Sequence, residues 1–281
     1  MYLEHFALTQ LPFHLTPDTE LFLGLAPHYE AIQTVSAALA MGEAIVKVTG
    51  EVGTGKTMVC RMLLTHMNDE VKWLYLPNPQ LSGLELRRAI AHELGLPEVA
   101  ELERLDIIHK QLLDLHRQGQ RVVVIVDEAQ ALSDEGLEAL RLLGNLETEQ
   151  SKLLQIVLLA QPELDRRLAE HHLRQLRQRI TFSAYLRPLS LSESVAYIDN
   201  RLLKAGGQPG LFSDRQKKAL WKACRGIPRL LNQVCHKSLL LAFYAQQNSV
   251  ANDHLFAAIH DTFDARKPQF KTPFFWGWSQ Q

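Results

Sequence analysis

The sequence has little cysteine, no long apolar run and almost no net charge. Its three cysteines form neither a paired framework nor a metal-ligand spacing, so we expect reduced thiols in the core. No stretch approaches the ~18 apolar residues of a membrane span, and no basic start precedes an apolar run, which predicts a cytoplasmic protein without a transmembrane span. Lys and Arg number 30 against 31 Asp and Glu, so no general basic field favours nucleic acid as a partner.

What is present suits a globular protein with more than one domain. The 281 residues suffice for about two domains of ordinary size, and 46% of them are hydrophobic. Residues 1–30 are interrupted by prolines and carry scattered aromatics, which predicts an N-terminal arm. We expect an α/β domain over 31–188, an all-α lid over 189–265 and an aromatic tail over 266–281.

The α/β domain is predicted from strands that alternate with helices. The expected strands cover residues 44–49, 71–76, 122–126, 153–160 and 180–185. The expected helices cover residues 29–41, 58–67, 84–94 and 106–118. Because the strands are continuously apolar rather than alternating, they indicate a parallel sheet covered on both faces, a three-layer core.

Beyond residue 188 the pattern is purely helical. Ser190 and Glu193 form a capping box, Gly206 and Gly207 close the helix that follows, and Ser213 is expected to cap the next helix. Further helices are expected over residues 214–224, 228–246 and 252–263. These helices predict a small all-α lid.

A complete P-loop pattern lies between the first strand and its helix. It reads Gly50-Glu51-Val52-Gly53-Thr54-Gly55-Lys56-Thr57, and Met58 follows it. Glycines let the backbone curl so that successive N–H groups point at phosphates, and the following helix contributes the positive end of its dipole. Lys56 is suited to the β- and γ-phosphates and the Thr57 hydroxyl to Mg²⁺, which predicts an ATP site. The alternative is a chance glycine-rich turn, which would have no reason to lie between a buried strand and a helix.

Two carboxylates follow the most apolar strand. The run of five β-branched residues at 122–126 ends in Asp127 and Glu128, the Walker B arrangement. We expect Asp127 to hold Mg²⁺ and Glu128 to orient or deprotonate the attacking water. The other interpretation is an ordinary helix N-cap after a strand.

Three polar positions downstream resemble the sensors and the arginine finger of AAA+ proteins. Gln161 follows the fourth strand where that superfamily carries sensor 1, and Arg229 opens a lid helix as sensor 2 does. Arg177 and Arg179 precede the last strand, and Arg179 is the preferred finger because it directly adjoins that strand. A guanidinium suits both arginine roles, since it meets two phosphate oxygens and keeps its charge. A helix cap at 161 and solvated arginines remain the alternatives.

Nearly the whole chain resembles the ExeA/GspA family of AAA+ ATPases. The motifs that carry the resemblance are Tyr2-Leu3-Glu4-His5-Phe6, Leu11-Pro12-Phe13, Thr16-Pro17-Asp18, His28, Glu30, the P-loop, Asp127-Glu128-Ala129-Gln130, Gln161-Pro162-Glu163-Leu164 and Gly226-Ile227-Pro228-Arg229-Leu230-Leu231-Asn232. The resemblance implies a cytoplasmic ATPase that forms a nucleotide-dependent ring, a hexamer, and serves a secretion or type IV pilus machine at the inner membrane. It also places His28 in the segment that binds the base.

The chain departs from that family at two places. Ala7 stands where the family usually has a glycine, so the sequence does not determine the conformation of that turn. Larger members continue into a membrane span and a peptidoglycan-binding domain, whereas this sequence stops at Gln281, so we expect no direct binding to the cell wall.

Other interpretations stay open from the sequence. A DNA-associated AAA+ ATPase of the transposition or initiation type has similar motifs, and a nucleotide-gated scaffold would use the same loop without turnover. The arginine-rich stretch 166–179 suits a contact between ATPase subunits better than a nucleic-acid surface. The aromatic cluster 273–278 suits the lid's own core, a partner groove or the headgroup zone of a membrane.

Overall fold

The computed structural model describes residues 2–16, 18–66, 70–77 and 80–269. The chain divides into two compact units, of which one, the sheet unit, comprises residues 28–52 and 59–186. The other, the helical unit, comprises residues 1–27, 53–58 and 187–281. The expected aromatic cluster at 273–278 lies outside the described residues. No helix among the described residues is long and apolar enough to cross a membrane.

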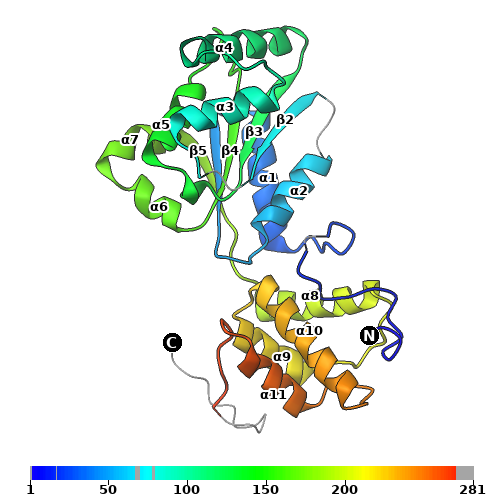
Figure 1. The fold of residues 1–281 in the computed structure, drawn as a ribbon. Helices are drawn as coiled ribbons and strands as arrows, with labels where there is room; N and C mark the ends of the chain where they lie inside the picture. The colour runs from blue at the N-terminus through cyan, green and yellow to red at the C-terminus, as the bar shows by residue number, and fades with distance from the viewer. Residues whose placement is uncertain (1, 17, 67–69, 78–79, 270–281) are drawn as a thin grey trace. The chain divides into compact units, whose positions relative to one another are not determined.

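The sheet unit is built on five parallel strands within the described part of the chain. They lie in the order β2-β3-β4-β1-β5 (Figure 1). Their bounds are β1 Ile45–Thr49, β2 Val71–Leu76, β3 Arg121–Val126, β4 Gln155–Ala160 and β5 Ile180–Tyr185. Because β4 lies between β3 and β1, the carboxyl ends of these three strands are neighbours, which is where a parallel sheet places its ligands.

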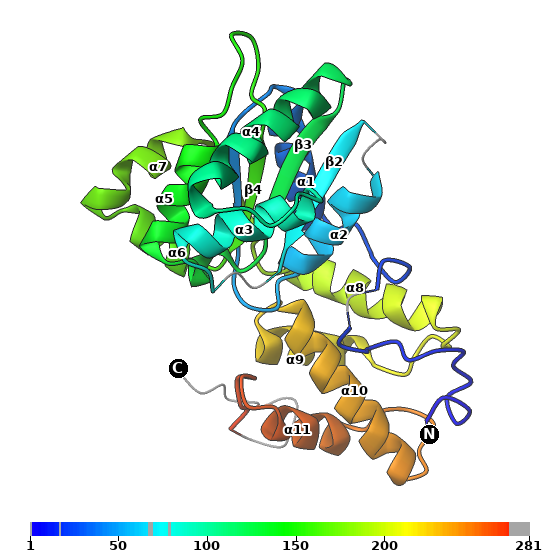
Figure 2. The same ribbon diagram turned by 45° about the horizontal axis from the view of Figure 1, so that its top comes forward.

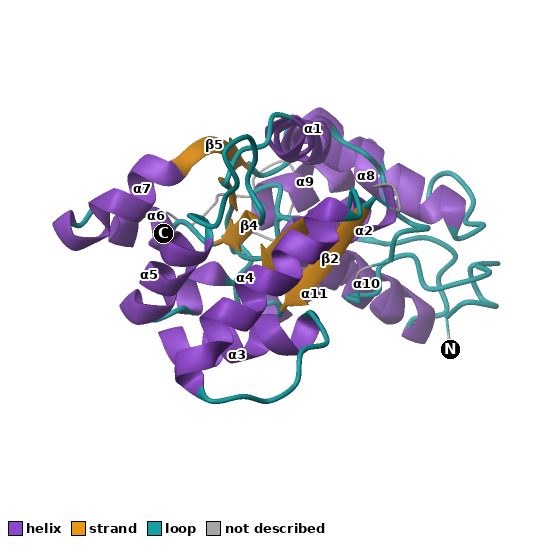
Figure 3. Cartoon of the chain, turned by 90° about the horizontal axis from the view of Figure 1, so that it is seen from above, coloured by secondary structure: helices purple, strands orange, loops and turns teal. Residues whose placement is uncertain are grey.

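Helices cover both faces of this sheet (Figures 1 and 3). Their bounds are α1 Ala26–Ala40, α2 Lys56–His66, α3 Gly83–Glu93, α4 Glu101–Arg117, α5 Asp134–Leu143, α6 Glu163–Leu168 and α7 Arg174–Arg179, with 3-10 turns η1 Ala129–Ala131 and η2 His171–Leu173. One buried cluster joins α1 and α2 to Val46, Val123 and Val157. A second joins α3, α4 and α5 to the opposite side chains of the same strands. The expected three-layer parallel core is therefore confirmed.

Some details of the sheet unit differ from the prediction. Helix α4 begins at Glu101 rather than at residue 106, because its buried Arg104 is paired with Glu101 and donates a hydrogen bond to the Val99 carbonyl at 2.7 Å. Pro27 lies inside the first turn of α1, where no intrahelical N–H bond is lost. Strand β5 is at the edge of the sheet, and its side chains alternate in exposure instead of being buried on both faces.

The helical unit contains α8 Leu191–Lys204, α9 Asp214–Cys224, α10 Pro228–Tyr244 and α11 Asn252–Asp261 (Figure 2). The capping box of Ser190 and Glu193 is confirmed, as is the cap that Ser213 provides for α9. Pro228 occupies the first turn of α10 as expected. All three cysteines are free and buried, two of them in this unit, which confirms their prediction as core residues.

The N-terminal arm packs against the helices of the same unit (Figure 2). Tyr2, Phe6 and Phe13 are buried in one cluster with α8, α9 and α10. The Tyr2 hydroxyl lies 2.9 Å from Nδ1 of His236, and the Thr9 N–H donates to the Ala205 carbonyl at 2.8 Å. In the turn after Phe6, Ala7 takes the left-handed conformation with φ 52°.

Candidate functional site

The P-loop leaves the carboxyl end of β1 as the sequence predicts. The Gly50 N–H donates to the Ala160 carbonyl at the end of β4, at 3.1 Å. Gly53 and Gly55 have φ of 81° and 108°, a region that side chains with a Cβ rarely adopt. Lys56 begins α2 and is 5% exposed. The loop therefore has the left-handed glycines and the helix N-terminus that a phosphate cradle requires.

Asp127 is held at the carboxyl end of β3 by hydrogen bonds with the end of β2. Its N–H donates to the Leu76 carbonyl at 3.0 Å, and the Tyr75 hydroxyl donates to its Oδ2 at 3.2 Å. Only 5% of Asp127 is exposed. Burial, and then the charge of Asp127, raises the pKa of the nearby Cys60 thiol to about 12. Asp127 is thus an oriented carboxylate in a poorly solvated place, and carboxylate oxygens are a ligand type that suits Mg²⁺.

Glu128 has an unusual backbone and two amide partners. Its φ of 55° and ψ of 40° lie in the left-handed region, which costs ~1–2 kcal/mol for a residue with a Cβ. Gln161 Nε2 donates to Glu128 Oε2 at 2.9 Å, and Gln130 Nε2 donates to the same oxygen. The two carboxylates at 127 and 128 therefore have separate surroundings, and the Gln161 side chain contacts the proposed base.

A charged network of Arg167, Asp134 and His172 binds the segment that follows Glu128. The Arg167 guanidinium donates to the carbonyls of Gln130 at 2.9 Å and Leu132 at 2.7 Å, and it also binds Asp134. His172 Nε2 lies 2.8 Å from the other oxygen of Asp134. The hydrogen bonds from Arg167 and then from His172 lower the pKa of the Asp134 carboxyl. Segment 130–134 is thereby fixed to the region just before α7.

Helix α7 carries the two candidate finger arginines. Arg177 is exposed, and Arg179, the last residue of the helix, is half-buried. Arg179 contributes to lowering the pKa of Glu147, after the larger effect of Lys152. Of the arginines in the stretch 166–179, Arg166 is paired with Glu163 at 2.6 Å. The positive charge that this stretch offers to solvent is therefore smaller than its composition suggests.

In the helical unit the Gly226-Ile227-Pro228-Arg229 motif lies against Gly53. The Arg229 N–H donates to the Gly53 carbonyl at 3.2 Å. A Cβ added at Gly53 would come within 2.7 Å of the Arg229 Cβ and 3.1 Å of Ile227 Cγ2. Gly226, with φ 72°, is itself packed so closely that an added Cβ would lie 2.0 Å from the Leu189 carbonyl oxygen. This packing places the predicted sensor 2 segment beside a P-loop glycine.

The remaining predicted residues occupy varied environments. His28 is buried in the first turn of α1, Met58 is buried in α2, and Thr54 is 1% exposed. Glu51 and Val52 are exposed at the tip of the loop. Exposed side chains at these two positions fit a loop whose backbone does the binding.

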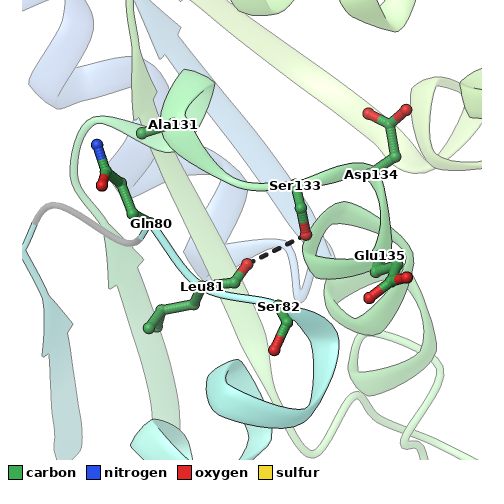
Figure 4. Close-up of a pocket in the computed structure, with 7 residues that line it drawn as sticks. All are labelled: Gln80, Leu81, Ser82, Ala131, Ser133, Asp134 and Glu135. Atoms are coloured by element: carbon green, nitrogen blue, oxygen red, sulfur yellow. Dashed lines mark hydrogen bonds between the residues drawn. The ribbon is translucent and has the colours of Figure 1, made fainter.

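A cavity of about 680 Å³ opens beside the segment that follows Glu128. Figure 4 shows its lining residues, Gln80, Leu81, Ser82, Ala131, Ser133, Asp134 and Glu135. The Ser133 hydroxyl caps α5 and donates to the Leu81 carbonyl at 3.2 Å. Close packing of glycines at the starts of α3 and α5 forms this corner, since a Cβ at Gly136 would lie 2.8 Å from the Leu81 oxygen.

Sequence reasoning missed Gln130 and Arg167 as parts of the site. Gln130 was noted only as part of the motif shared with the ExeA/GspA family, and Arg167 only as part of a positive stretch. Both act through hydrogen bonds between loops about thirty residues apart, which no periodicity reports. The signal that could have identified Gln130 is its position two residues after Glu128, the candidate base.

Comparison with known proteins agrees with this geometry. A family model described as an AAA domain matches residues 39–168. The General secretion pathway protein A of Aeromonas hydrophila is 40% identical over 269 residues, which are 95% of this chain and 49% of that protein. The chain therefore spans about half the length of this curated relative.

Solved structures show the same fold at low identity. The Aeropyrum pernix ORC2 protein is 16% identical with a TM-score of 0.67, over 92% of this chain and 73% of that one. The Aeropyrum pernix ORC1 protein in complex with DNA is 20% identical with a TM-score of 0.65, over 90% and 69%. The Thermotoga maritima RuvB motor is 14% identical with a TM-score of 0.59, over 89% and 73%. The fold is that of a P-loop AAA+ protein.

Proposed function

We propose that this chain binds ATP with Mg²⁺ and hydrolyses it to ADP and phosphate. The observation that carries the proposal is the sheet edge where three strands end. The P-loop begins after β1, Asp127 and Glu128 follow β3, and Gln161 follows β4 and binds Glu128 at 2.9 Å. The AAA domain match and the 40% identical relative support the same chemistry.

The P-loop residues would bind the nucleotide through its phosphates. The backbone N–H groups from Gly50 to Thr57 would bind phosphate oxygens, and Lys56 would neutralise the β- and γ-phosphates. The Thr57 hydroxyl and the Asp127 carboxylate are the oxygen ligands proposed for Mg²⁺, which when bound would neutralise charge on the phosphates. We also propose that Arg229 binds phosphate and that His28 lies near the base.

Glu128 is proposed to orient and deprotonate the attacking water, with Gln161 beside it. The test compares wild type with Glu128→Gln and Lys56→Ala. Losing a general base costs about 10²–10⁴ in rate, so Glu128→Gln should retain ATP affinity and lose turnover by that factor. Lys56→Ala should lose affinity. Wild-type protein that fails to bind ATP in the presence of magnesium would refute the proposal.

A neighbouring subunit is proposed to complete the site with an arginine from α7. Arg179 is the preferred finger and Arg177, exposed on the same helix, is the alternative. Turnover per subunit should fall when the protein is diluted until it dissociates. Replacing the true finger arginine should abolish turnover. Adding Glu128→Gln subunits, which cannot hydrolyse ATP but keep the arginine, should then restore turnover in the finger variant. Constant turnover per subunit across the dilution would exclude a finger supplied in trans.

We propose that hydrolysis serves an envelope secretion or type IV pilus machine at the cytoplasmic side of the inner membrane. The name of the relative, General secretion pathway protein A, supports a role in secretion. The finer proposal is a role like that of MshM, the ATPase linked to mannose-sensitive haemagglutinin pili. Affinity purification of the Glu128→Gln variant with ATP should retain envelope proteins that Lys56→Ala does not. Retention of DNA instead, with DNA-stimulated turnover, would favour the initiation-type alternative.

A further inference from the structure

Glu128 presents one carboxylate oxygen to protein donors and leaves the other without one. Both amide donors, from Gln130 and Gln161, bind Oε2. Among the described residues no donor meets Oε1. A base needs one oxygen free to accept a proton from water, so the arrangement around Glu128 directs the two oxygens to different tasks.

The orientation of the Gln130 amide follows from its partners. The Gln161 main-chain N–H donates to Gln130 Oε1 at 2.9 Å, so the oxygen of this amide must face Gln161. The NH₂ end then faces the Glu128 carboxylate, where an oxygen would be repelled. Gln130 therefore links Glu128, two residues after β3, to Gln161, the residue after β4, through both ends of one side chain.

The backbone of Gln130 is held as firmly as its side chain. Its carbonyl accepts a hydrogen bond from Arg167, which in turn binds the Leu132 carbonyl and Asp134. Gln130 is the middle residue of the 3-10 turn η1, and the Ala131 N–H that follows it donates to the Glu128 carbonyl at 2.8 Å. Gln130 thus has little freedom to release Glu128 without breaking several bonds.

We infer that Gln130 is a positioning residue for the reaction, which fixes the Glu128 carboxylate and couples it to Gln161. The inference rests on the proposed ATPase function. Gln130 touches neither phosphate nor water in this role and acts through Glu128. Its amide holds Oε2 and fixes the carboxylate over a left-handed backbone, which leaves Oε1 to accept a proton from water.

Two substitutions of similar volume separate an electrostatic role from a packing role. Gln130→Met removes both hydrogen bonds, whereas Gln130→Glu keeps an acceptor for the Gln161 N–H and places a second carboxylate against Glu128. The matched control is Gln118→Glu, at an exposed position after α4. We expect kcat to fall about tenfold in Gln130→Met and further in Gln130→Glu. In both variants the KM for ATP should stay within about twofold of wild type, and the melting temperature within a few degrees.

The outcomes separate this inference from the proposed function. Wild type and Gln118→Glu that hydrolyse ATP, together with the expected order of kcat, support the positioning role. Equal kcat in wild type and both Gln130 variants would overturn it while leaving the ATPase intact. Losses in KM and melting temperature instead of kcat would show a packing role and also overturn it. A wild-type protein without turnover would refute the function itself.

Discussion

Replacing Gly226 by alanine tests the packing that holds the start of α10. Gly226 has φ 72°, and an added Cβ would lie 2.0 Å from the Leu189 carbonyl oxygen. Real Cβ contacts lie beyond 3 Å, so the backbone must shift by about an ångström. That shift would disturb the Leu189 N–H bond to the Gly226 carbonyl at 2.8 Å and the Trp221 indole bond to the Leu189 carbonyl at 3.1 Å.

The expected loss in the free energy of unfolding can be built from these parts. An alanine in the left-handed region costs ~1–2 kcal/mol, and each weakened hydrogen bond costs ~1 kcal/mol. The total is about 3–4 kcal/mol. The entropy of unfolding is ~2.1 cal/mol/K per residue near 60 °C, so a chain of 281 residues that unfolds as one unit should melt about 5–7 °C lower.

The control for this variant is Gly119→Ala. Gly119 has a similar φ of 78°, but nothing lies within 4 Å of an added Cβ. The free energy of unfolding of Gly119→Ala should therefore fall only by the strain of the left-handed backbone, ~1–2 kcal/mol, and the variant should melt about 2–3 °C lower. Differential scanning calorimetry of wild type and both variants measures the difference. Equal shifts in the two variants would refute the argument from close packing at Gly226.

Three further predictions follow from other contacts. Ala7→Gly relieves left-handed strain in the arm and should raise the free energy of unfolding by ~0.5 kcal/mol in urea, and a loss would contradict this. The Cys60 thiol, whose pKa is raised to about 12 by burial and then by Asp127, should resist iodoacetamide at pH 8 in native protein, and fast labelling would contradict its burial. Hydrogen bonds from Arg187 and from Ser190 hold the pKa of Glu193 at about 2, so its stabilising effect is complete above pH ~4.5 and is lost as the pH falls toward 2. Glu193→Gln should flatten the pH dependence of unfolding in that window, and an unchanged slope would refute the assignment.

The strands and the P-loop could be predicted because their signals are local. Buried parallel strands have apolar side chains on both faces, so the runs at 45–49 and 122–126 stand out from the sequence. The P-loop is a contiguous pattern next to one of them. The capping boxes, such as Ser190 with Glu193, are local as well and were confirmed for that reason.

The features that were missed have different causes. Helix α5 was not predicted, although Ser133 caps it and its leucines recur at helical spacing, because the apolar face is short and charged residues surround it. Arg104 is buried in spite of its charge, since acidic neighbours neutralise it. The amide of Gln130 reaches Gln161 across two strand ends. This last contact joins residues 31 positions apart and leaves no pattern in the order of residues.

The order of strands in the sheet has a consequence for how the chain is made. Ile45 in β1 pairs with Ile156 in β4, 111 positions further along the chain. At the ~5–20 residues per second of ribosomal synthesis, the segment 45–49 must wait roughly 6–20 s for its partner. During that interval an apolar strand has no sheet to join, so a nascent chain of this protein should depend on holding chaperones until about residue 160 has emerged.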